Sequence, residues 1–456
     1  MNKPFLDYYR CPEIYGEFCL QGKPSSQAGY FRFGSDAIAY GRLSSDACAD
    51  SASGELRDAM QDVEVSNSRP SLTFDPTDIV DDLRLERYVN GHGSGKWNRR
   101  LKATVKDSYY SLRPYLPIFV RKFVQQLALG GWRRRPFPQW PVDRSVEKIL
   151  RRLLALSMQA KGVERIPFIW FWPNGYSGCA LMTHDVETSS GLDFIPSMMD
   201  IEDSYSVKSA FQIIPEGRYC APESLLNQIR ARGCELNVHD LNHDGHLYRK
   251  RSEFVHRAKQ INKYGRKFGA LGFRSGVLYR NLNWYDDLNF AYDMSVPNIG
   301  HLDPQPGGCC TVMPYFIGEI LELPLTTIQD YSLFHILGDY SIELWKKQVQ
   351  LILEENGLLS FNIHPDYVLP SKARGVYIEL LEYLAEVRSQ ASLWMPLPSQ
   401  VDRWWRKRSQ MRLVARGNTW EIDGEGNEEA CIAYAVLEGE QVRYLFREKA
   451  AEALAV

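Results

Sequence analysis

Two short stretches of the chain carry side chains that could together form a hydrolytic metal site. Asp185 and Glu187 follow the apolar run Cys179–Met182, which has the composition of a buried strand. His239 and His243 are four residues apart after a second strand-like run, so both imidazole rings could face one ion. Two imidazoles and one carboxylate would leave coordination positions open for water and a substrate, which is the arrangement of a catalytic metal site.

Each of these histidines also has a purely structural interpretation. Histidine pairs at this spacing arise often by chance, so His239 and His243 could instead be polar residues that flank a surface turn. His364, which ends the apolar run Leu358–Ile363, could be a core histidine at a strand end. The choice between chemistry and structure depends on the elements that would position these residues.

Strand-like and helix-like patterns alternate from about residue 166 to residue 400. The predicted strands are 180–183, 209–215, 236–238, 271–274, 321–325 and 358–363. The predicted helices are 195–204, 223–232, 253–264, 342–356 and 374–389. This alternation predicts a parallel sheet or barrel, with the candidate residues at the carboxyl ends of its strands.

The regions before this segment have a different composition. Residues 1–95 hold stretches rich in glycine, serine, alanine and aspartate, which predict short strands and loops. Residues 95–165 contain seventeen lysines and arginines against four acidic residues. Such a basic segment could lie on an anionic membrane surface or bind an anionic polymer, or its charged faces could simply be solvated. A helix is expected within it, from Asp143 as its N-cap to about Ala160.

We therefore expect three regions: an irregular, then basic and helical region over 1–165, a catalytic domain over 166–408, and a small antiparallel β appendage over 409–456. The formal net charge of −2 points to no particular partner, and no nucleic acid is expected. Nine cysteines without a CxxC pair favour reduced thiols. The N-terminus lacks an apolar signal core, so we expect a cytoplasmic location, with peripheral attachment at the inner face of the membrane as an option.

Three more stretches place polar residues at predicted strand ends, namely Arg274, Asp293 and His364. The five stretches in chain order are Thr183–Glu187, His239–His243, Gly272–Gly276, Tyr292–Asp293 and Ile363–His364. Together they resemble the motifs of the polysaccharide deacetylase family, the NodB homology domain of carbohydrate esterase family four. The resemblance covers about residues 166–400. It implies a distorted (β/α) barrel of the α/β class, a bound divalent metal and hydrolysis of N-acetyl groups on sugars.

The resemblance also implies roles for the residues that match. His239, His243 and Glu187 would hold the metal, with zinc first and cobalt or nickel as alternatives. Asp185 would take the proton of the attacking water, and His364 would protonate the departing amine. Two further residues would assist: Arg274 would hold the base carboxylate ionised, and Asp293 would tune a catalytic group.

The chain departs from the common form of the family at several positions. The usual pair of adjacent aspartates is replaced by Asp185 and Glu187 with Val186 between them, so the base and ligand roles could also be exchanged. Asp240 stands where a small hydroxyl residue is usual, and no proline follows Arg274. These changes leave the chemistry intact but put the substrate in question. Two other histidines are expected to lie outside the metal shell, His184 behind the acidic loop and His246 in a loop.

Three functions agree with these patterns. The first is a metal-dependent deacetylase acting on an N-acetylated glycan, either a polysaccharide or its precursor. The second is a hydrolase of another carbon–nitrogen bond, such as a cyclic amide, which the altered acidic motif would allow. The third is a binding protein with a decayed site, recruited to an anionic membrane or polymer by residues 95–165.

Overall fold

The computed structural model describes residues 2–44, 48–66, 69–90, 129–417 and 419–446. Their contacts divide the chain into two units, one formed by 1–93, 144–176 and 403–456, the other by 94–143 and 177–402. Residues 95–128, the first part of the basic segment 95–165, lie outside the described residues. None of the helices within the described ranges combines the length and apolar character that a membrane span requires.

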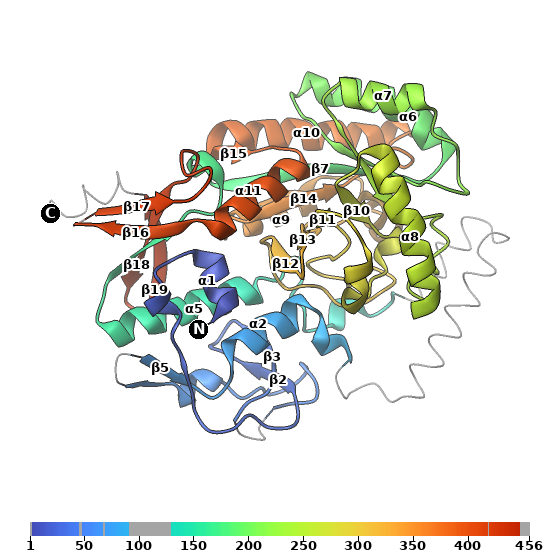
Figure 1. Cartoon of the computed structure of the whole chain (residues 1–456). Helices are drawn as coiled ribbons and strands as arrows, with labels where there is room; N and C mark the ends of the chain where they lie inside the picture. Colours follow the sequence, from blue (N-terminus) through green and yellow to red (C-terminus); the bar gives the residue numbers. More distant parts are fainter. Residues whose placement is uncertain (1, 45–47, 67–68, 91–128, 418, 447–456) are drawn as a thin grey trace. The chain divides into compact units, whose positions relative to one another are not determined.

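The unit that contains 177–402 is built on a nine-stranded sheet (Figure 1). Its strands are β7 (Gly178–Val186), β8 (Ala210–Ile213), β9 (Glu235–His239), β10 (Gly272–Arg274), β11 (Tyr292–Asp293), β12 (Tyr315–Ile317), β13 (Ile320–Glu322), β14 (Leu358–Asn362) and β15 (Leu393–Trp394). The strand order is β12-β13-β11-β10-β9-β8-β7-β14, and β15 also pairs with β7. All neighbours are parallel except β12 and β13. Every residue of β7 is buried, as a central parallel strand requires.

Helices connect these parallel strands, as the sequence predicts. They are α6 (Ser189–Ser204), α7 (Glu223–Ala231), α8 (Arg251–Phe268), α9 (Glu343–Leu353) and α10 (Ser371–Ala391). Thr188 caps α6 by accepting from the backbone N–H of Gly191, and Gly269 ends α8 in a left-handed conformation. Helix α6 therefore begins almost directly after the acidic motif at the end of β7, which fixes the direction of the chain at the candidate site.

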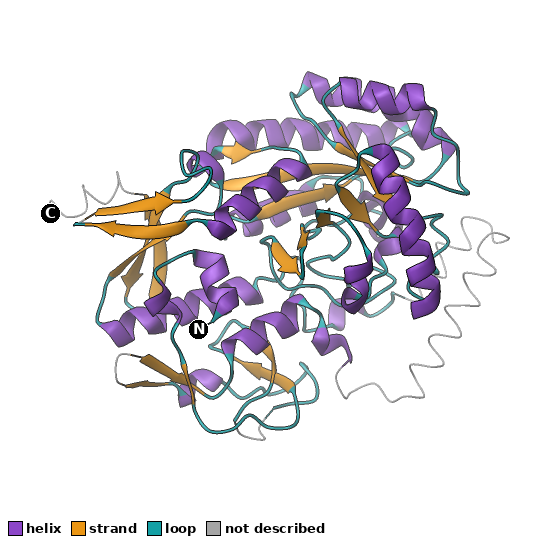
Figure 2. Cartoon of the chain, in the orientation of Figure 1, coloured by secondary structure: helices purple, strands orange, loops and turns teal. Residues whose placement is uncertain are grey.

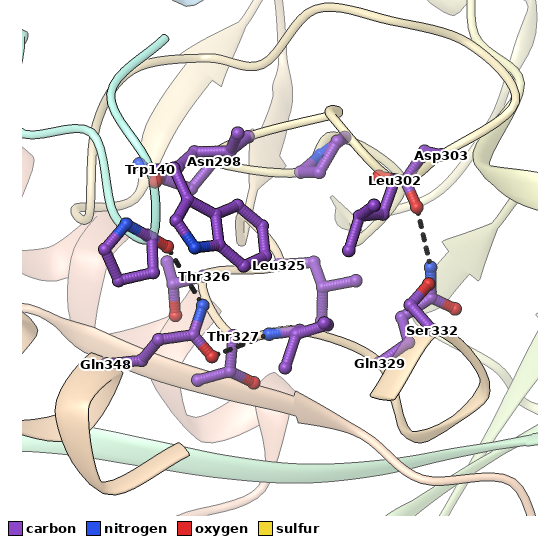
Figure 3. Close-up of a pocket in the computed structure, with 14 residues that line it drawn as sticks. Trp140, Asn298, Leu302, Asp303, Leu325, Thr326, Thr327, Gln329, Ser332 and Gln348 are labelled. Carbon is purple, nitrogen blue, oxygen red and sulfur yellow. Dashed lines mark hydrogen bonds between the residues drawn. The ribbon is translucent and has the colours of Figure 1, made fainter. Parts of the chain in front are cut away.

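The sheet closes on itself through the segment that follows β13. Thr326 donates from Oγ1 to the carbonyl oxygen of Leu358 at 2.6 Å, and Thr327 donates from Oγ1 to that of Ser360 at 2.7 Å. These side-chain bonds, together with backbone bonds from Thr327 to Ser360 and from Leu358 to Val312, join this part of the chain to β14, so the barrel has an irregular seam. The α/β class and the distorted barrel that the sequence predicts are confirmed. A cavity of about 30 Å³ lies along this seam, with Gln348 among its lining residues (Figure 3).

The described residues of the other unit form three helices and four small sheets; Figure 2 marks the helices and strands by colour. The helices are α1 (Lys3–Tyr9), α2 (Pro76–Arg84) and α5 (Ser145–Lys161); α11 (Pro398–Gln410) crosses from one unit to the other. The sheets are β1 (Cys19–Leu20) with β5 (Arg69–Leu72) and β4 (Glu64–Ser66), β2 (Gly29–Arg32) with β3 (Ile38–Gly41), β19 (Gln441–Phe446) with β18 (Ile432–Glu438) and β6 (Arg165–Ile169), and β16 (Arg412–Arg416) with β17 (Thr419–Asp423). The strands predicted near the C-terminus are thus antiparallel, and one of them pairs with β6, some 260 residues earlier in the chain.

A buried arginine connects distant segments of this unit. Arg408 is 1% exposed and donates from Nη2 to the carbonyl oxygens of Tyr8 and Ile169, and from Nε to that of Trp170. Its guanidinium therefore satisfies backbone groups of α1 and of the end of β6 at once.

The predicted start of α5 is correct, but its predicted N-cap is wrong. The helix begins at Ser145 with Arg144 at the N-cap position and without a capping side chain. Oδ2 of Asp143 accepts instead from the backbone N–H of Gln139.

Candidate metal and hydrolytic site

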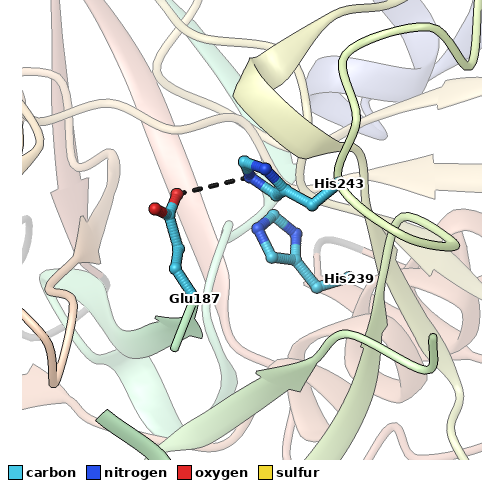
Figure 4. A group of neighbouring side chains, drawn as sticks. All are labelled: Glu187, His239 and His243. Carbon is cyan, nitrogen blue, oxygen red and sulfur yellow. Dashed lines mark ion pairs between the residues drawn. The ribbon is translucent and has the colours of Figure 1, made fainter. Parts of the chain in front are cut away.

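The carboxyl ends of the barrel strands bring six of the seven predicted site residues together. His239 and Arg274 are the last residues of β9 and β10, and Asp185 is the penultimate residue of β7. Glu187 follows β7 directly, and His364 comes two residues after β14. His243 reaches the same place from the loop after β9, as Figure 4 shows for the two histidines and the glutamate. The seventh residue, Asp293, ends β11 but has other contacts, given below.

Glu187, His239 and His243 form the group of possible metal ligands among the described residues, each offering one atom within 4.8 Å of the others. Oε1 of Glu187 lies 3.3 Å from Nε2 of His243. Nδ1 of His239 lies 3.1 Å from the carbonyl oxygen of Arg274, so this nitrogen carries the proton and Nε2 presents its lone pair. Nε2 is buried and has no hydrogen-bond partner. Two imidazole nitrogens and a carboxylate oxygen suit zinc or a similar divalent ion, so the residues present fit the implied metal.

The charges of the group also suit a cation. Burial lowers the pKa of His239 to about 4, which keeps its ring neutral near pH 7 as a metal ligand must be. Burial alone would raise the pKa of Glu187, but the neighbouring His243 holds it well below its usual range. The carboxylate is therefore ionised near neutral pH.

A tight loop, rather than a helix, carries the second histidine. Asp240 and His243 have positive φ angles of 57° and 54°. The loop after β10 packs closely against it, since a Cβ on Gly276 would lie 2.5 Å from Oδ2 of Asp240 and 3.0 Å from the ring of His243. A glycine is thus required at position 276 for the two loops to meet. From the loop after β8, Nη2 of Arg218 lies 3.2 Å from Nδ1 of His243 and donates to its carbonyl oxygen at 3.0 Å.

Asp185 is held by nitrogen donors on both of its oxygens. Oδ1 accepts from Nη1 of Arg274 at 2.9 Å, and Oδ2 accepts from Nδ2 of Asn362 at 2.8 Å. Burial alone would raise the pKa of Asp185, but Arg274 and His239 hold it well below its usual range. Oδ2 also lies 3.8 Å from Nε2 of His239, so this anion borders the metal-ligand group.

His364 faces the same space with the opposite charge. Its Nδ1 donates to Oδ1 of Asp330 at 2.6 Å, and its Nε2 lies 3.9 Å from Asp185 and 4.0 Å from Glu187. Burial opposes a charged ring, but the Asp330 carboxylate raises the pKa of His364 to about 9. The ring is therefore an imidazolium near neutral pH, with its Nε2 proton directed toward the two acids.

Asp293 contacts a different set of groups. It accepts from the backbone N–H and the hydroxyl of Ser295, at 2.7 and 2.9 Å, and from Tyr285 at 3.2 Å. The carbonyl oxygen of Met294, between these residues, accepts from Nε of Arg274 at 2.9 Å. Asp293 therefore shapes the loop that holds Arg274.

The two other histidines behave as expected. His184 is buried behind the acidic loop, bonded to the carbonyl oxygen of Ile363 and to Glu202 at 2.8 and 2.7 Å. His246 lies 3.7 Å from the carboxylate of Asp244 and is outside the ligand group.

Sequence reasoning missed three residues that contact the site: Asp330, Asn362 and Arg218. Asp330 follows the predicted strand 321–325, and an acid after a strand is the signal that identified Asp185. Asn362 is the one amide in the apolar run Leu358–Ile363, which was itself a signal. Arg218 lies in a loop and had no comparable signal.

No protein-family model and no curated protein matches this chain. A protein from Mycobacterium smegmatis assigned as a polysaccharide deacetylase shares 19% identity with it, over 55% of this chain and 98% of that one, with a TM-score of 0.43. Puue allantoinase shares 12% identity over 52% of this chain and 92% of its own, with a TM-score of 0.42. A probable polysaccharide deacetylase from Pseudomonas aeruginosa PAO1 shares 14% identity over 52% of this chain and 93% of its own, with a TM-score of 0.41. At these identities and TM-scores, the function has to be argued from the residues of this chain.

Proposed function

We propose that the chain is a metal-dependent hydrolase of the polysaccharide deacetylase family, which removes N-acetyl groups from a sugar in a polysaccharide or its precursor. The observation that carries this proposal is the convergence of an ionised acid and an imidazolium on one ligand group. Asp185 and His364 come from neighbouring strands, and both lie within 4.0 Å of Glu187 or His239. A base, an acid and a cation site in one place are what amide hydrolysis requires.

The protein's own residues would divide the reaction as follows. A divalent ion, zinc first, held by Glu187, His239 and His243 would polarise the acetamide carbonyl and lower the pKa of an attacking water. Asp185 accepts the proton of that water as the new carbon–oxygen bond forms. His364 donates its Nε2 proton to the nitrogen as the carbon–nitrogen bond breaks, which yields acetate and a free amine.

Two residues position these groups. Arg274 keeps Asp185 ionised and oriented through its bond at 2.9 Å. Asp293 acts indirectly. It accepts from the backbone N–H of Ser295, and the carbonyl oxygen of the preceding residue, Met294, accepts from Nε of Arg274. We therefore assign Asp293 a positioning role.

The assignment of Asp185 as base and Glu187 as ligand is supported by their partners. Glu187 lies 3.3 Å from a ring nitrogen of His243 and belongs to the ligand group. Both oxygens of Asp185 accept from Arg274 and Asn362, which suits a carboxylate that stays beside the metal.

The test is release of acetate from a panel of N-acetylated oligosaccharides by the full-length, zinc-loaded protein. We expect acetate from at least one glycan, and a loss of about 10²–10⁴-fold in kcat for both Asp185→Asn and His364→Ala. His246→Ala is the matched control and should retain activity, since His246 is paired with Asp244 outside the ligand group. If the metal-loaded protein releases no acetate but opens a cyclic amide, hydrolysis of cyclic amides replaces deacetylation as the proposed function.

A further inference from the structure

Asn362 contacts the proposed base but has no role in the reaction described so far. It is the last residue of β14, is fully buried, and pairs in register with Thr183 of β7. Its Nδ2 donates to Oδ2 of Asp185 at 2.8 Å and to Oε1 of Gln329 at 3.2 Å. Both bonds use the same amide nitrogen, so the orientation of this side chain decides whether Asp185 receives a proton donor.

A second amide fixes the orientation of the first. Nε2 of Gln329 donates to Oδ1 of Asp303 at 3.2 Å, as Figure 3 shows beside the small cavity at the barrel seam. Because Nε2 of Gln329 donates to this carboxylate oxygen, the carbonyl oxygen of Gln329 is left facing Asn362. That carbonyl in turn draws the N–H side of Asn362, which then also faces Asp185. Asp303, Gln329 and Asn362 thus form a row of hydrogen bonds that orients both amides, and the row ends with an N–H that faces the base Asp185.

The loop that carries Asp303 is itself held to the unit. Asn298 donates from Nδ2 to the carbonyl oxygens of Asp143 and Thr311, at 2.8 and 2.9 Å, and accepts from the backbone N–H of Asp143. Asn298 is 1% exposed, and Asp303 is 9% exposed. These hydrogen bonds anchor the loop that carries Asp303, the residue of the row that lies farthest from Asp185.

The position of Asp185 makes such control necessary. Ligand atoms on one tetrahedral zinc ion lie roughly 3–4 Å apart, given bond lengths near 2 Å. Oδ2 of Asp185 is 3.8 Å from Nε2 of His239, almost as close as Glu187 is to His243 at 3.3 Å. Among the described residues, only Glu187, His239 and His243 have ligand atoms that all lie within 4.8 Å of one another, so Asp185 stands outside this group although it lies close to His239. Asn362 holds the oxygen of Asp185 that lies nearest His239 in that outside position.

We propose that Asn362, oriented by Gln329 and Asp303, is a positioning residue that keeps Asp185 out of the metal's ligand shell, so that Glu187 is the ion's only carboxylate ligand. This inference rests on the proposed metal site, and it explains how a chain with the spacing Asp185-Val186-Glu187 separates base from ligand. Partners of this kind set ligand geometry in metal sites generally. In this proposal, the residue that separates the base from the metal ligand lies on β14, far from the acidic motif in sequence.

The experiment compares the full-length protein with Asn362→Leu, each loaded with Co²⁺. Leucine has the same branching at Cγ as asparagine but no N–H, so Asp185 should turn to the ion. We expect a visible absorption spectrum of higher coordination number for the variant, and release of Co²⁺ to a chelator about tenfold more slowly. With a glycan substrate, kcat should fall while KM stays unchanged. Ser360→Ala is the matched control, since Ser360 lies on the same strand, is also buried, and has no bond to Asp185.

Two further variants make the result decisive. Adding Asp185→Ala to Asn362→Leu should restore the original spectrum, because Asp185 is the incoming ligand. Gln329→Leu leaves Asn362 in place and should give the same spectral change at smaller amplitude, which covers the case that Asn362→Leu fails to fold. A wild-type spectrum in both Asn362→Leu and Gln329→Leu overturns the inference, as does a wild-type protein that binds no cobalt. Cobalt binding without any deacetylase activity defeats the proposed function instead, and the spectra still decide the role of Asn362.

Discussion

His364 and Asp330 form a buried pair joined by two hydrogen bonds. Nδ1 of the ring donates to Oδ1 of the carboxylate at 2.6 Å, and the backbone N–H of His364 donates to Oδ2 at 2.8 Å. Asp330 therefore fixes the orientation of the ring and favours its charged form, which leaves the Nε2 proton facing the acids of the site. The proposed reaction depends on this proton.

Asp330→Asn is expected to move the alkaline limit of activity to lower pH. Since the pKa of His364 is raised to about 9, its proton is present below pH 9 and is lost as the pH rises through that value. Without the Asp330 carboxylate, burial still lowers the pKa of His364 and only Glu187 and Asp185 still raise it, so the pKa falls below 9. The measurement is kcat against pH between 6 and 10, and the variant should lose activity at a lower pH than the wild type.

Asp339→Asn is the control for this experiment. Asp339 lies nine residues later and accepts from Ser341 rather than from a site residue. It should leave the alkaline limit unchanged. Identical pH profiles for Asp330→Asn and the wild type would show that His364 is not the proton donor.

The proposed ligand group predicts the metal content of purified variants. We expect about one equivalent of zinc in the wild type and a loss of most of it in His239→Ala, because one of three protein ligands is removed. His246→Ala should keep its metal, since that ring lies 3.7 Å from Asp244 and outside the group. Elemental analysis after dialysis gives the answer, and equal metal content in both variants would argue against the ligand group.

The sequence predicted those features that local pattern determines. Apolar runs that end in polar residues became parallel strands with the site at their carboxyl ends, since buried backbone must pair within the sheet and polar side chains collect where the strands stop. For this reason the sequence predicted His239, His243 and a carboxylate of the acidic motif at one place, while the choice of Glu187 as the ligand came from the family resemblance.

The features that were missed depend on contacts between distant segments. Asp330 and His364 are 34 residues apart, and nothing local shows that one would hold the other. The same applies to Asp143, whose local pattern fits an N-cap but whose carboxylate is taken by Gln139. Asn362 resembled a stray polar residue in a strand, because the acid that it contacts is 177 residues away.

The close packing of the two loops predicts an effect of a single added methyl group. In Gly276→Ala the new Cβ would meet Oδ2 of Asp240 at 2.5 Å and the His243 ring at 3.0 Å, so His243 must move. We expect metal affinity to fall by about 10–100-fold, as for other changes next to a ligand. Competition with a chelator measures it. Gly375→Ala in α10, where a Cβ would meet nothing within 4 Å, should leave the affinity unchanged.

The unit outside the barrel predicts a loss of stability that should leave the metal site intact. Arg408→Met keeps most of the side-chain volume but removes the buried donors to the carbonyl oxygens of Tyr8, Ile169 and Trp170. We expect the free energy of unfolding of this unit to fall by about 3 kcal/mol or more, measured by chemical denaturation. Zinc content should match the wild type, because Glu187, His239 and His243 all belong to the other unit. If folded Arg408→Met contained less zinc than the wild type, the metal site would depend on the unit that holds Arg408, which contradicts this prediction.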